Sequence, residues 1–226
     1  MAETEDGAKA ALYEAFAATG KALGSGKRLE LLDLLAQGER SVEGLARTAG
    51  LNVTTASAHL QTLKQAGLVA TRREGVKVFY RLAGDDVARL CVLLQQVAQD
   101  RQPAVEPARV AFLGPDGGRE FSVPQMRASL QAGTAVLLDV RPAEEYRAGH
   151  IPGALSIPVG ELADRIGELP EGVEVVVYCR GEYCALAYDA VRLLARRGRR
   201  AVRLTDGMLE WRLAGLPVSA GAGEGA

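Results

Sequence analysis

The feature that most constrains the fold of this 226-residue chain is a valine-rich run that ends in a cysteine and is followed by a helical pattern. Residues 175–178 are apolar and mostly β-branched, which is typical of a buried strand. A short polar loop that contains Gly181 follows, and apolar residues then recur at helical spacing between Ala187 and Leu194. We therefore predict that Cys179 lies at the carboxyl end of a strand, just before a helix.

A cysteine in this position is expected to be reactive. The backbone N–H groups of a tight loop and the N-terminus of a helix both favour negative charge, so they favour the thiolate over the thiol. Arg180 adds a cation beside Cys179, and the loop continues with Gly181, Glu182 and Tyr183. The alternative is a buried cysteine that only ends the strand.

The second half of the chain alternates between strand and helix patterns. Apolar runs predict strands at 110–113, 135–140, 154–157, 173–178 and 201–204, and helices are predicted at 122–130, 142–148, 159–166, 185–197 and 206–214. This alternation predicts an α/β domain with a central, mainly parallel sheet and helices on both of its faces. Ligand sites in such folds lie beyond the carboxyl ends of the strands, which is where Cys179 is placed.

The first half is predicted to be mainly helical. Helical patterns cover residues 9–23, 27–36, a short segment from Ser41, 53–66 and a last segment from Asp85 to Val97, and a basic turn joins two β-like runs at 68–71 and 76–82. Asn52 is the predicted N-cap of the helix 53–66, in which Val53, Ala56, Leu60 and Leu63 are expected to share one apolar face. The order of these elements is that of a winged helix-turn-helix, and the alternative is an all-α interaction domain with an incidental hairpin.

This half resembles the ArsR/SmtB family of bacterial repressors over about residues 9–100. The similarity rests on residues 31–82, which are LLDLLAQGERSVEGLARTAGLNVTTASAHLQTLKQAGLVATRREGVKVFYRL. The resemblance implies that the helix 53–66 is a recognition helix for a double-stranded DNA operator and that the terminal helices build a homodimer. The matching DNA-contact positions are Thr54, Thr55, Ser57, Ala58, His59 and Gln61, with Arg72, Arg73 and Lys77 on the wing.

The chemistry of these positions suits DNA, although each has a simpler interpretation. Small polar side chains let a helix enter the major groove closely, and cations on a hairpin can meet phosphate. The alternatives are a partly buried structural role for His59, helix-start roles for the two threonines and Ser57, and a solvated turn for the wing cations. The formal net charge of the chain is −1, so DNA contact depends on a local patch.

The chain departs from the metal-sensing members of that family, which use cysteines before the turn or paired histidines and carboxylates in the last helix. Residues 41–46 contain no cysteine, and the last helix of this half contains Cys91 but no histidine. His59 and His150, the two histidines, have no partner at metal-ligand spacing. We expect neither a metal nor another cofactor. For Cys91 we expect a buried position in the dimer helix, with a redox sensor as the alternative.

The second half resembles a single rhodanese domain from about residue 109 to 219. The similarity rests on LLDVRPAEEYRAGHIPGALSIPV, VVVYCRGEYCALA and LTDGMLEWRLAGLPV. The resemblance implies that Cys179 carries sulfur as a persulfide, cradled by the backbone amides of residues 180–184. It also implies a sulfane sulfur donor such as thiosulfate or polysulfide. The other signature residues are expected to be scaffold, with an ion pair between Arg141 and Glu145, and are Asp139, Arg141, Glu145, His150 and Gly153.

Two loop positions refine this prediction. Phosphatases of the same fold need an arginine six residues after the cysteine, and that position is Ala185, so the sequence argues against a phosphatase. Cys184 is a candidate resolving residue, which would attack a persulfide on Cys179 and release sulfide. The alternative for Cys184 is a small loop-closing residue that faces the core.

We predict a two-domain protein. Residues 1–101 form a mainly α winged helix-turn-helix domain for DNA binding and dimerisation, 102–108 a proline-marked linker, 109–219 the α/β rhodanese-like domain and 220–226 a flexible tail. There is no apolar run of about twenty residues and no signal-peptide pattern, so we expect no membrane partner. Three cysteines are too few for a disulfide framework, so we predict a cytoplasmic location.

The pairing of these domains predicts a DNA-binding transcriptional regulator, a repressor, whose rhodanese domain forms a persulfide and senses or transfers sulfane sulfur. The alternative is a thiosulfate or persulfide sulfurtransferase enzyme in which the first domain mainly provides dimerisation or DNA tethering. A third hypothesis makes the rhodanese domain an inert partner-binding module, and the intact Cys179 argues against it. The sequence leaves open whether the chain turns over as an enzyme.

Overall fold

The computed structural model describes residues 2–115 and 119–221, and the chain divides into two compact units, Met1–Gln95 and Gln96–Ala226. Residues 222–226 of the predicted tail lie outside the described residues. Within the described part of the chain, no helix is both long enough and apolar enough to cross a bilayer.

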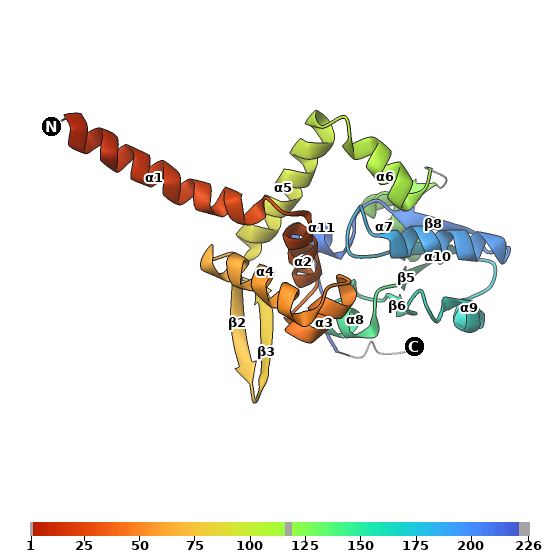
Figure 1. The fold of residues 1–226 in the computed structure, drawn as a ribbon. Helices are drawn as coiled ribbons and strands as arrows, with labels where there is room; N and C mark the ends of the chain where they lie inside the picture. The colour runs from red at the N-terminus through yellow and green to blue at the C-terminus, as the bar shows by residue number, and fades with distance from the viewer. Residues whose placement is uncertain (1, 116–118, 222–226) are drawn as a thin grey trace. The chain divides into compact units, whose positions relative to one another are not determined.

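The first unit consists of helices packed against a small sheet (Figure 1). Its helices are α1 (Ala2–Leu23), α2 (Gly26–Ala36), α3 (Val42–Thr48), α4 (Val53–Gln65) and the first part of α5 (Asp85–Arg101), and its strands are β1 (Arg40–Ser41), β2 (Val69–Glu74) and β3 (Lys77–Leu82). The strands pair antiparallel in the order β1-β3-β2. The sequence did not predict β1, because two residues are too few to show strand alternation.

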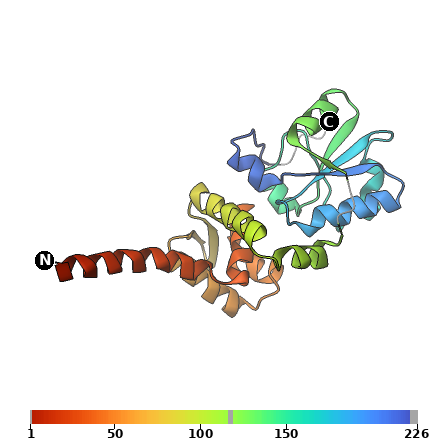
Figure 2. The ribbon, with the colours of Figure 1, turned by 90° about the horizontal axis from the view of Figure 1, so that it is seen from above.

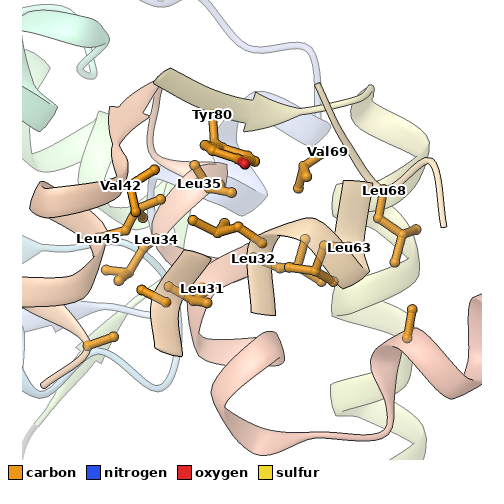
Figure 3. Close-up of a cluster of buried hydrophobic side chains, with 14 of the residues drawn as sticks. Leu31, Leu32, Leu34, Leu35, Val42, Leu45, Leu63, Leu68, Val69 and Tyr80 are labelled. Carbon is orange, nitrogen blue, oxygen red and sulfur yellow. The ribbon is translucent and has the colours of Figure 1, made fainter. Parts of the chain in front are cut away.

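The core of this unit is built from one face of each of its central helices. Leu31 and Leu32 of α2, Leu45 of α3 and Leu63 of α4 are each at most 1% exposed, and they cluster with Tyr80 of β3 (Figure 3). Of α1, the described residues that join the core are near its C-terminal end, and most of the helix extends away from it (Figure 1). An isolated helix surface of this kind is expected to be covered in the working protein.

Helix α4 begins as predicted and presents a narrow buried face. The side-chain Oδ1 of Asn52 accepts a hydrogen bond from the backbone N–H of Thr55 at 2.8 Å, which confirms the N-cap. Ala56 and Leu60 are fully buried. Val53 is 48% exposed, so its predicted place on the apolar face was wrong; as the first helical residue it precedes the packed segment of the helix.

The second unit is a parallel sheet with helices on both faces (Figure 2). The strands β4 (Glu120–Phe121), β5 (Ala135–Asp139), β6 (Leu155–Ser156), β7 (Glu174–Tyr178) and β8 (Ala201–Leu204) are arranged in the order β4-β8-β7-β5-β6 with parallel pairing throughout. The helices are α6 (Val105–Leu113), α7 (Val123–Gln131), α8 (Ala143–Ala148), α9 (Leu162–Arg165), a 3₁₀ turn (Ile166–Glu168), α10 (Ala185–Arg196) and α11 (Met208–Leu213). The predicted α/β architecture is confirmed.

Alternate strand residues feed two separate cores. Val176 packs in a cluster that contains Trp211 of α11, and its neighbour Val177 packs in a second cluster with Leu194 of α10. Successive side chains of a strand point to opposite faces of a sheet, so these clusters are the two sides of one buried sheet. Strand β7 is therefore buried on both faces, and the residue that follows it is held at a fixed position.

The segment before this sheet differs from the prediction. Residues 110–113 were expected to form a strand, but they form the end of α6, where the N–H of Gly114 bonds the carbonyl of Val110 at 2.8 Å. A four-residue apolar run fits a strand and a helix equally well, and the longer pattern from Val105 decides for a helix. The division of the chain after Gln95 falls inside α5, and α6 begins within the range predicted as a linker.

Candidate functional site

The cysteine loop joins β7 to α10. Cys179 follows the last residue of β7, and Cys184 is the N-cap of α10, as the strand-loop-helix pattern predicted. The two residues form a disulfide, their Cα atoms are 6.2 Å apart, and their exposed fractions are 3% and 9%. The fold therefore brings both sulfurs together in a largely buried place, at the carboxyl end of a central strand and the N-terminus of a helix.

Arg180 is held by a carboxylate from another element. Its guanidinium donates three hydrogen bonds, of 2.7 to 3.1 Å, to the side chain of Glu145 on α8, which is 1% exposed in its side chain. A bidentate arginine–carboxylate pair fixes geometry as well as charge. Arg180 thus fastens the loop to α8, and its positive charge beside Cys179 is shared with a buried carboxylate.

A second buried ion pair supports the neighbouring strand end. Arg141 donates to Asp139 at 2.6 Å, with both side chains fully buried, and to the carbonyl of Gly149 at 2.8 Å. His150 stacks on the ring of Tyr146 and bonds its carbonyl through Nδ1 at 2.9 Å. These are scaffold contacts, as expected. The charge of Glu145 also acts on Arg141, in line with the predicted pair. The sequence did not predict Asp139 and the carbonyl of Gly149 as partners of Arg141.

The N-terminus of α11 packs directly on the cysteine loop. The N–H of Met208 bonds the carbonyl of Cys179 at 2.9 Å, and the N–H of Leu209 bonds the carbonyl of Arg180 at 3.0 Å. A Cβ on Gly207 would overlap the backbone nitrogen of Gly181, so no larger residue fits there without a shift. Both hydrogen bonds are accepted by backbone carbonyl groups of the loop. The sequence did not single out Gly207. The available signal was a glycine inside the LTDGMLEW segment.

The remaining loop residues reach toward the surface. Tyr183 donates a hydrogen bond of 2.7 Å from its hydroxyl to Oε1 of Gln99 on α5, and burial together with the nearby Glu182 carboxylate raises the pKa of that hydroxyl. Glu182 is exposed. No sequence pattern pointed to Gln99, because the contact joins residues 84 positions apart.

On the predicted DNA helix, the candidate residues occupy the sides of α4 that its core does not use. Thr54, Ala58 and Gln61 are exposed, and Thr55, Ser57 and His59 are half-buried. Gln61 also donates to the hydroxyl of Tyr80 at 3.0 Å, which ties its side chain to β3. The structure therefore collects these residues on one helix, with one of them braced against the sheet.

The wing separates its three cations into two kinds. Arg72 is bound to the carboxylates of Glu39 and Glu74 at 2.6 and 2.7 Å and lies over the ring of Phe79, and the two carboxylates hold its pKa above the usual value. Arg73 and Lys77 are exposed on the hairpin, near the tip formed by residues 75 and 76. All three cations are exposed, and Arg72 differs in being paired with two carboxylates.

The described residues offer no group of three or more His, Cys, Asp or Glu side chains arranged to hold a metal ion. Cys91 is a free thiol, half-buried against the core of the first unit. Burial, with a smaller effect from the charge of Asp33, raises the pKa of this thiol to about 11. A thiol of this kind stays protonated near neutral pH, which favours the core role over a redox sensor.

Two family models match the chain. The model described as "Bacterial regulatory protein, arsR family" matches residues 25–71, and the "Rhodanese-like domain" model matches residues 122–214. With the winged helix-turn-helix of the first unit and the cysteine loop of the second, these matches define the class: the chain belongs to the ArsR-family transcriptional regulators and carries a C-terminal rhodanese domain.

The chain is similar to two curated proteins and to a solved structure. The chain is 55% identical over 214 residues to the HTH-type transcriptional regulator Rv0324 of Mycobacterium tuberculosis, covering 95% of this chain and 94% of that protein. It is 36% identical over 89 residues to a sulfurtransferase of Allochromatium vinosum, covering 39% of this chain and 81% of that protein. A solved homodimeric winged helix-turn-helix DNA-binding domain, Mb0332 of Mycobacterium bovis, is 57% identical with a TM-score of 0.40, over 42% of this chain and 89% of that one.

Proposed function

We propose that this regulator is a homodimeric repressor whose DNA affinity is set by sulfur chemistry at Cys179 and Cys184. The observation that carries the proposal is the joining of these two buried sulfurs, at the end of β7 and the start of α10. A loop that holds two cysteines this close can accept a sulfur atom on one and discharge it with the other.

The chemistry proceeds in two balanced steps. The Cys179 thiolate attacks the outer sulfur of a sulfane donor; with thiosulfate, the sulfur–sulfur bond breaks, sulfite leaves with the electron pair, and Cys179 becomes a persulfide. The Cys184 thiolate then attacks the Sγ of Cys179, and hydrosulfide leaves as the intramolecular disulfide forms. The donor is the oxidant in this sequence, and a cellular thiol must reduce the disulfide to restore the loop.

The loop environment favours the first step. Cys179 is bonded to Cys184, the N-cap of α10, and a helix N-terminus favours negative charge. Of the loop amides, the N–H of Cys184 already bonds the carbonyl of Gly181 at 3.2 Å. The ion pair between Arg180 and Glu145 keeps the loop in place. The Cα separation of Cys179 and Cys184 lies within the range that a disulfide requires, so the second step needs no large backbone movement.

The loop is also connected toward the DNA-binding unit. Tyr183 bonds Gln99 near the C-terminal end of α5, and α5 begins at Asp85 among residues of the first unit. Persulfide and disulfide forms of the loop constrain residues 180–183 differently, so they place the Tyr183 hydroxyl differently. We propose that this difference reaches α4 through α5.

For the DNA complex we propose a dimer that reads a double-stranded operator with α4. Large apolar side chains are exposed on α1 and α5, including Tyr13 and Phe16 at 62% each and Leu93 at 56%, and a second copy is the partner that would cover them. The operator contacts are the candidate residues of α4, with Arg73 and Lys77 on phosphate. Such a regulator meets the chromosome in the cytoplasm.

Fluorescence anisotropy tests the proposal. The full chain is titrated onto DNA from its own upstream region at fixed salt, before and after treatment with polysulfide, for wild type, Cys179→Ser and the matched control Cys91→Ser. We expect the affinity to shift in wild type and Cys91→Ser and to stay constant in Cys179→Ser. A polysulfide-dependent shift in DNA affinity that persists in Cys179→Ser would contradict the proposal.

The second candidate function is sulfurtransferase catalysis, which the similarity to the sulfurtransferase of Allochromatium vinosum favours. An enzyme passes sulfur to an acceptor repeatedly, whereas a sensor is loaded once per signal. Sulfite release from thiosulfate, with cyanide or a thiol as acceptor, separates the two: many turnovers per Cys179 indicate an enzyme, and a single equivalent indicates a sensor.

A further inference from the structure

A charged cavity of about 480 Å³ lies in the second unit, among α6, α10, β8 and the start of β4. Its volume falls within the range of small-molecule sites and is several times what a sulfate-sized ion fills. Among the described residues, four arginines and three glutamates line it, so the formal charge of the lining is +1. The volume and the charged lining therefore suit a charged ligand of the size of a small metabolite.

Two of these arginines are deeply placed. The side chains of Arg109 and Arg203 are each only 10% exposed, whereas their carboxylate partners Glu106 and Glu120 are 62% and 40% exposed. A buried guanidinium is stabilised by negative charge close by, and partly exposed carboxylates such as these supply part of it. An anion inside the cavity would add to the compensation that these carboxylates provide.

The clearest anion position is beside Tyr188. The guanidinium carbon of Arg203 lies 4.6 Å from the centroid of this ring, and that of Arg192 lies 6.0 Å from the same centroid. Arg192 is also paired with Asp189 at 3.4 Å and Arg203 with Glu120. Both guanidinium groups line the cavity beside Tyr188, so an anion bound there would be attracted by both. Arg192 also donates to the carbonyl of Leu113, which holds its side chain over the cavity.

We propose that this cavity binds a small organic acid, with its carboxylate between Arg192 and Arg203 and its carbon skeleton against Tyr188 and Val191. The volume argues for an organic ligand over a simple oxyanion, and the charged lining argues against a neutral one. No thiol lines this site, so ligand binding does not require the proposed sulfur chemistry. Glu182 of the cysteine loop lines the same cavity, so a bound ligand can in turn affect that loop.

The test uses the full-length protein and glutarate as the probe. Isothermal titration calorimetry and thermal melting are performed at constant ionic strength, with sodium chloride replacing glutarate in the reference. We expect binding in wild type and equally in Cys179→Ser. Arg192→Gln is expected to weaken binding by about tenfold, the size of one charge-assisted hydrogen bond, and Val191→Trp to abolish it by filling the cavity. Arg196→Gln, on the same helix but outside the lining, is the matched control.

Three results would overturn the proposal. One is the absence of any heat or melting shift with glutarate in wild type. Another is unchanged binding in both Arg192→Gln and Val191→Trp, each checked by its own melting temperature to be folded. The third is sulfate binding as tightly as glutarate, which would identify an oxyanion site instead of one for an organic acid. Because Cys179→Ser is included, failure here is distinguishable from failure of the sulfur chemistry.

Discussion

Gly207, the N-cap of α11, lies against the cysteine loop. A Cβ there would overlap the backbone nitrogen of Gly181 and lie 2.5 Å from the carbonyl carbon of Arg180, and backbone atoms cannot rotate away as a side chain can. We expect Gly207→Ala to lower the free energy of unfolding by about 1–3 kcal/mol, as overpacking does. Persulfide formation at Cys179 should fall with it.

Thermal unfolding and trapping of the persulfide by a thiol-reactive probe measure the two effects. Gly167→Ala is the matched control, because a Cβ at Gly167 meets no atom within 4 Å, and it should leave both quantities unchanged. Equal melting temperatures for the two variants would show that the loop and α11 do not pack as described.

Cys91 offers a prediction on pH. Because burial raises its pKa to about 11, only about one molecule in a thousand carries the Cys91 thiolate at about pH 8. Iodoacetamide should therefore label Cys91 in the native protein far more slowly than a free cysteine, and the rate should climb tenfold per pH unit. Mass spectrometry with a urea-unfolded control measures this; rapid, pH-independent labelling would show that the thiol is not buried.

The sequence identified the residues of the cysteine loop but not what holds them. Cys179 and Cys184 were found because strand, loop and helix follow one another along the chain. The partners of that loop, Glu145 for Arg180 and Gln99 for Tyr183, come from elements 35 and 84 residues away. No local pattern encodes such pairs, since each depends on how the sheet and its helices assemble.

The three cations of the wing differ in their ion pairing. All three cations are exposed, but within the described part of the chain only Arg72 forms ion pairs, with the carboxylates of Glu39 and Glu74. If the wing binds phosphate, Arg73→Ala or Lys77→Ala should weaken DNA binding and lower the slope of log affinity against log salt by about 0.9 for each phosphate that is no longer neutralised. Arg72→Ala should lower thermal stability and leave that slope nearly unchanged.

Anisotropy titrations at four salt concentrations measure the slopes, and thermal melting measures stability. Lys9 on the exposed part of α1 provides a control cation away from the wing, so Lys9→Ala should leave the slope as in wild type. A larger change of slope for Arg72→Ala than for Arg73→Ala would reverse the roles assigned to these two arginines.

Elements with a long periodic pattern were predictable, and short or ambiguous ones were not. The helix α4 lies where the sequence placed it, because its apolar spacing and its N-cap are local signals. The strand β8 was also placed correctly, although its run of four residues is as short as 110–113. The two-residue strands β1 and β4 exist only through their partners, and the apolar run 110–113 became the end of α6.

At the scale of the whole chain, separate motifs in the sequence predicted the two families. They did not predict how the cysteine loop would be coupled to the first unit. The candidate that we propose is the 2.7 Å hydrogen bond between Tyr183 and Gln99, both of which belong to the second unit. Allosteric coupling needs an element whose state both sites bias, and this bond joins the loop to a helix that starts in the DNA-binding unit.

Tyr183→Phe removes only the hydroxyl of this link. We expect the variant to form the disulfide and release sulfide as wild type does, because Cys179 and Cys184 are untouched, while its DNA affinity no longer responds to polysulfide. Gln99→Leu should have the same effect, and the double variant should add nothing further, because the two residues share one bond. Gln131→Leu, at an exposed position at the end of α7, is the control. DNA binding by anisotropy and sulfide release are measured on the same samples. A full response of DNA affinity to polysulfide in Tyr183→Phe would mean that the signal leaves the loop by another route. An absence of sulfide release would mean that Tyr183 takes part in the sulfur chemistry and not in passing the signal on.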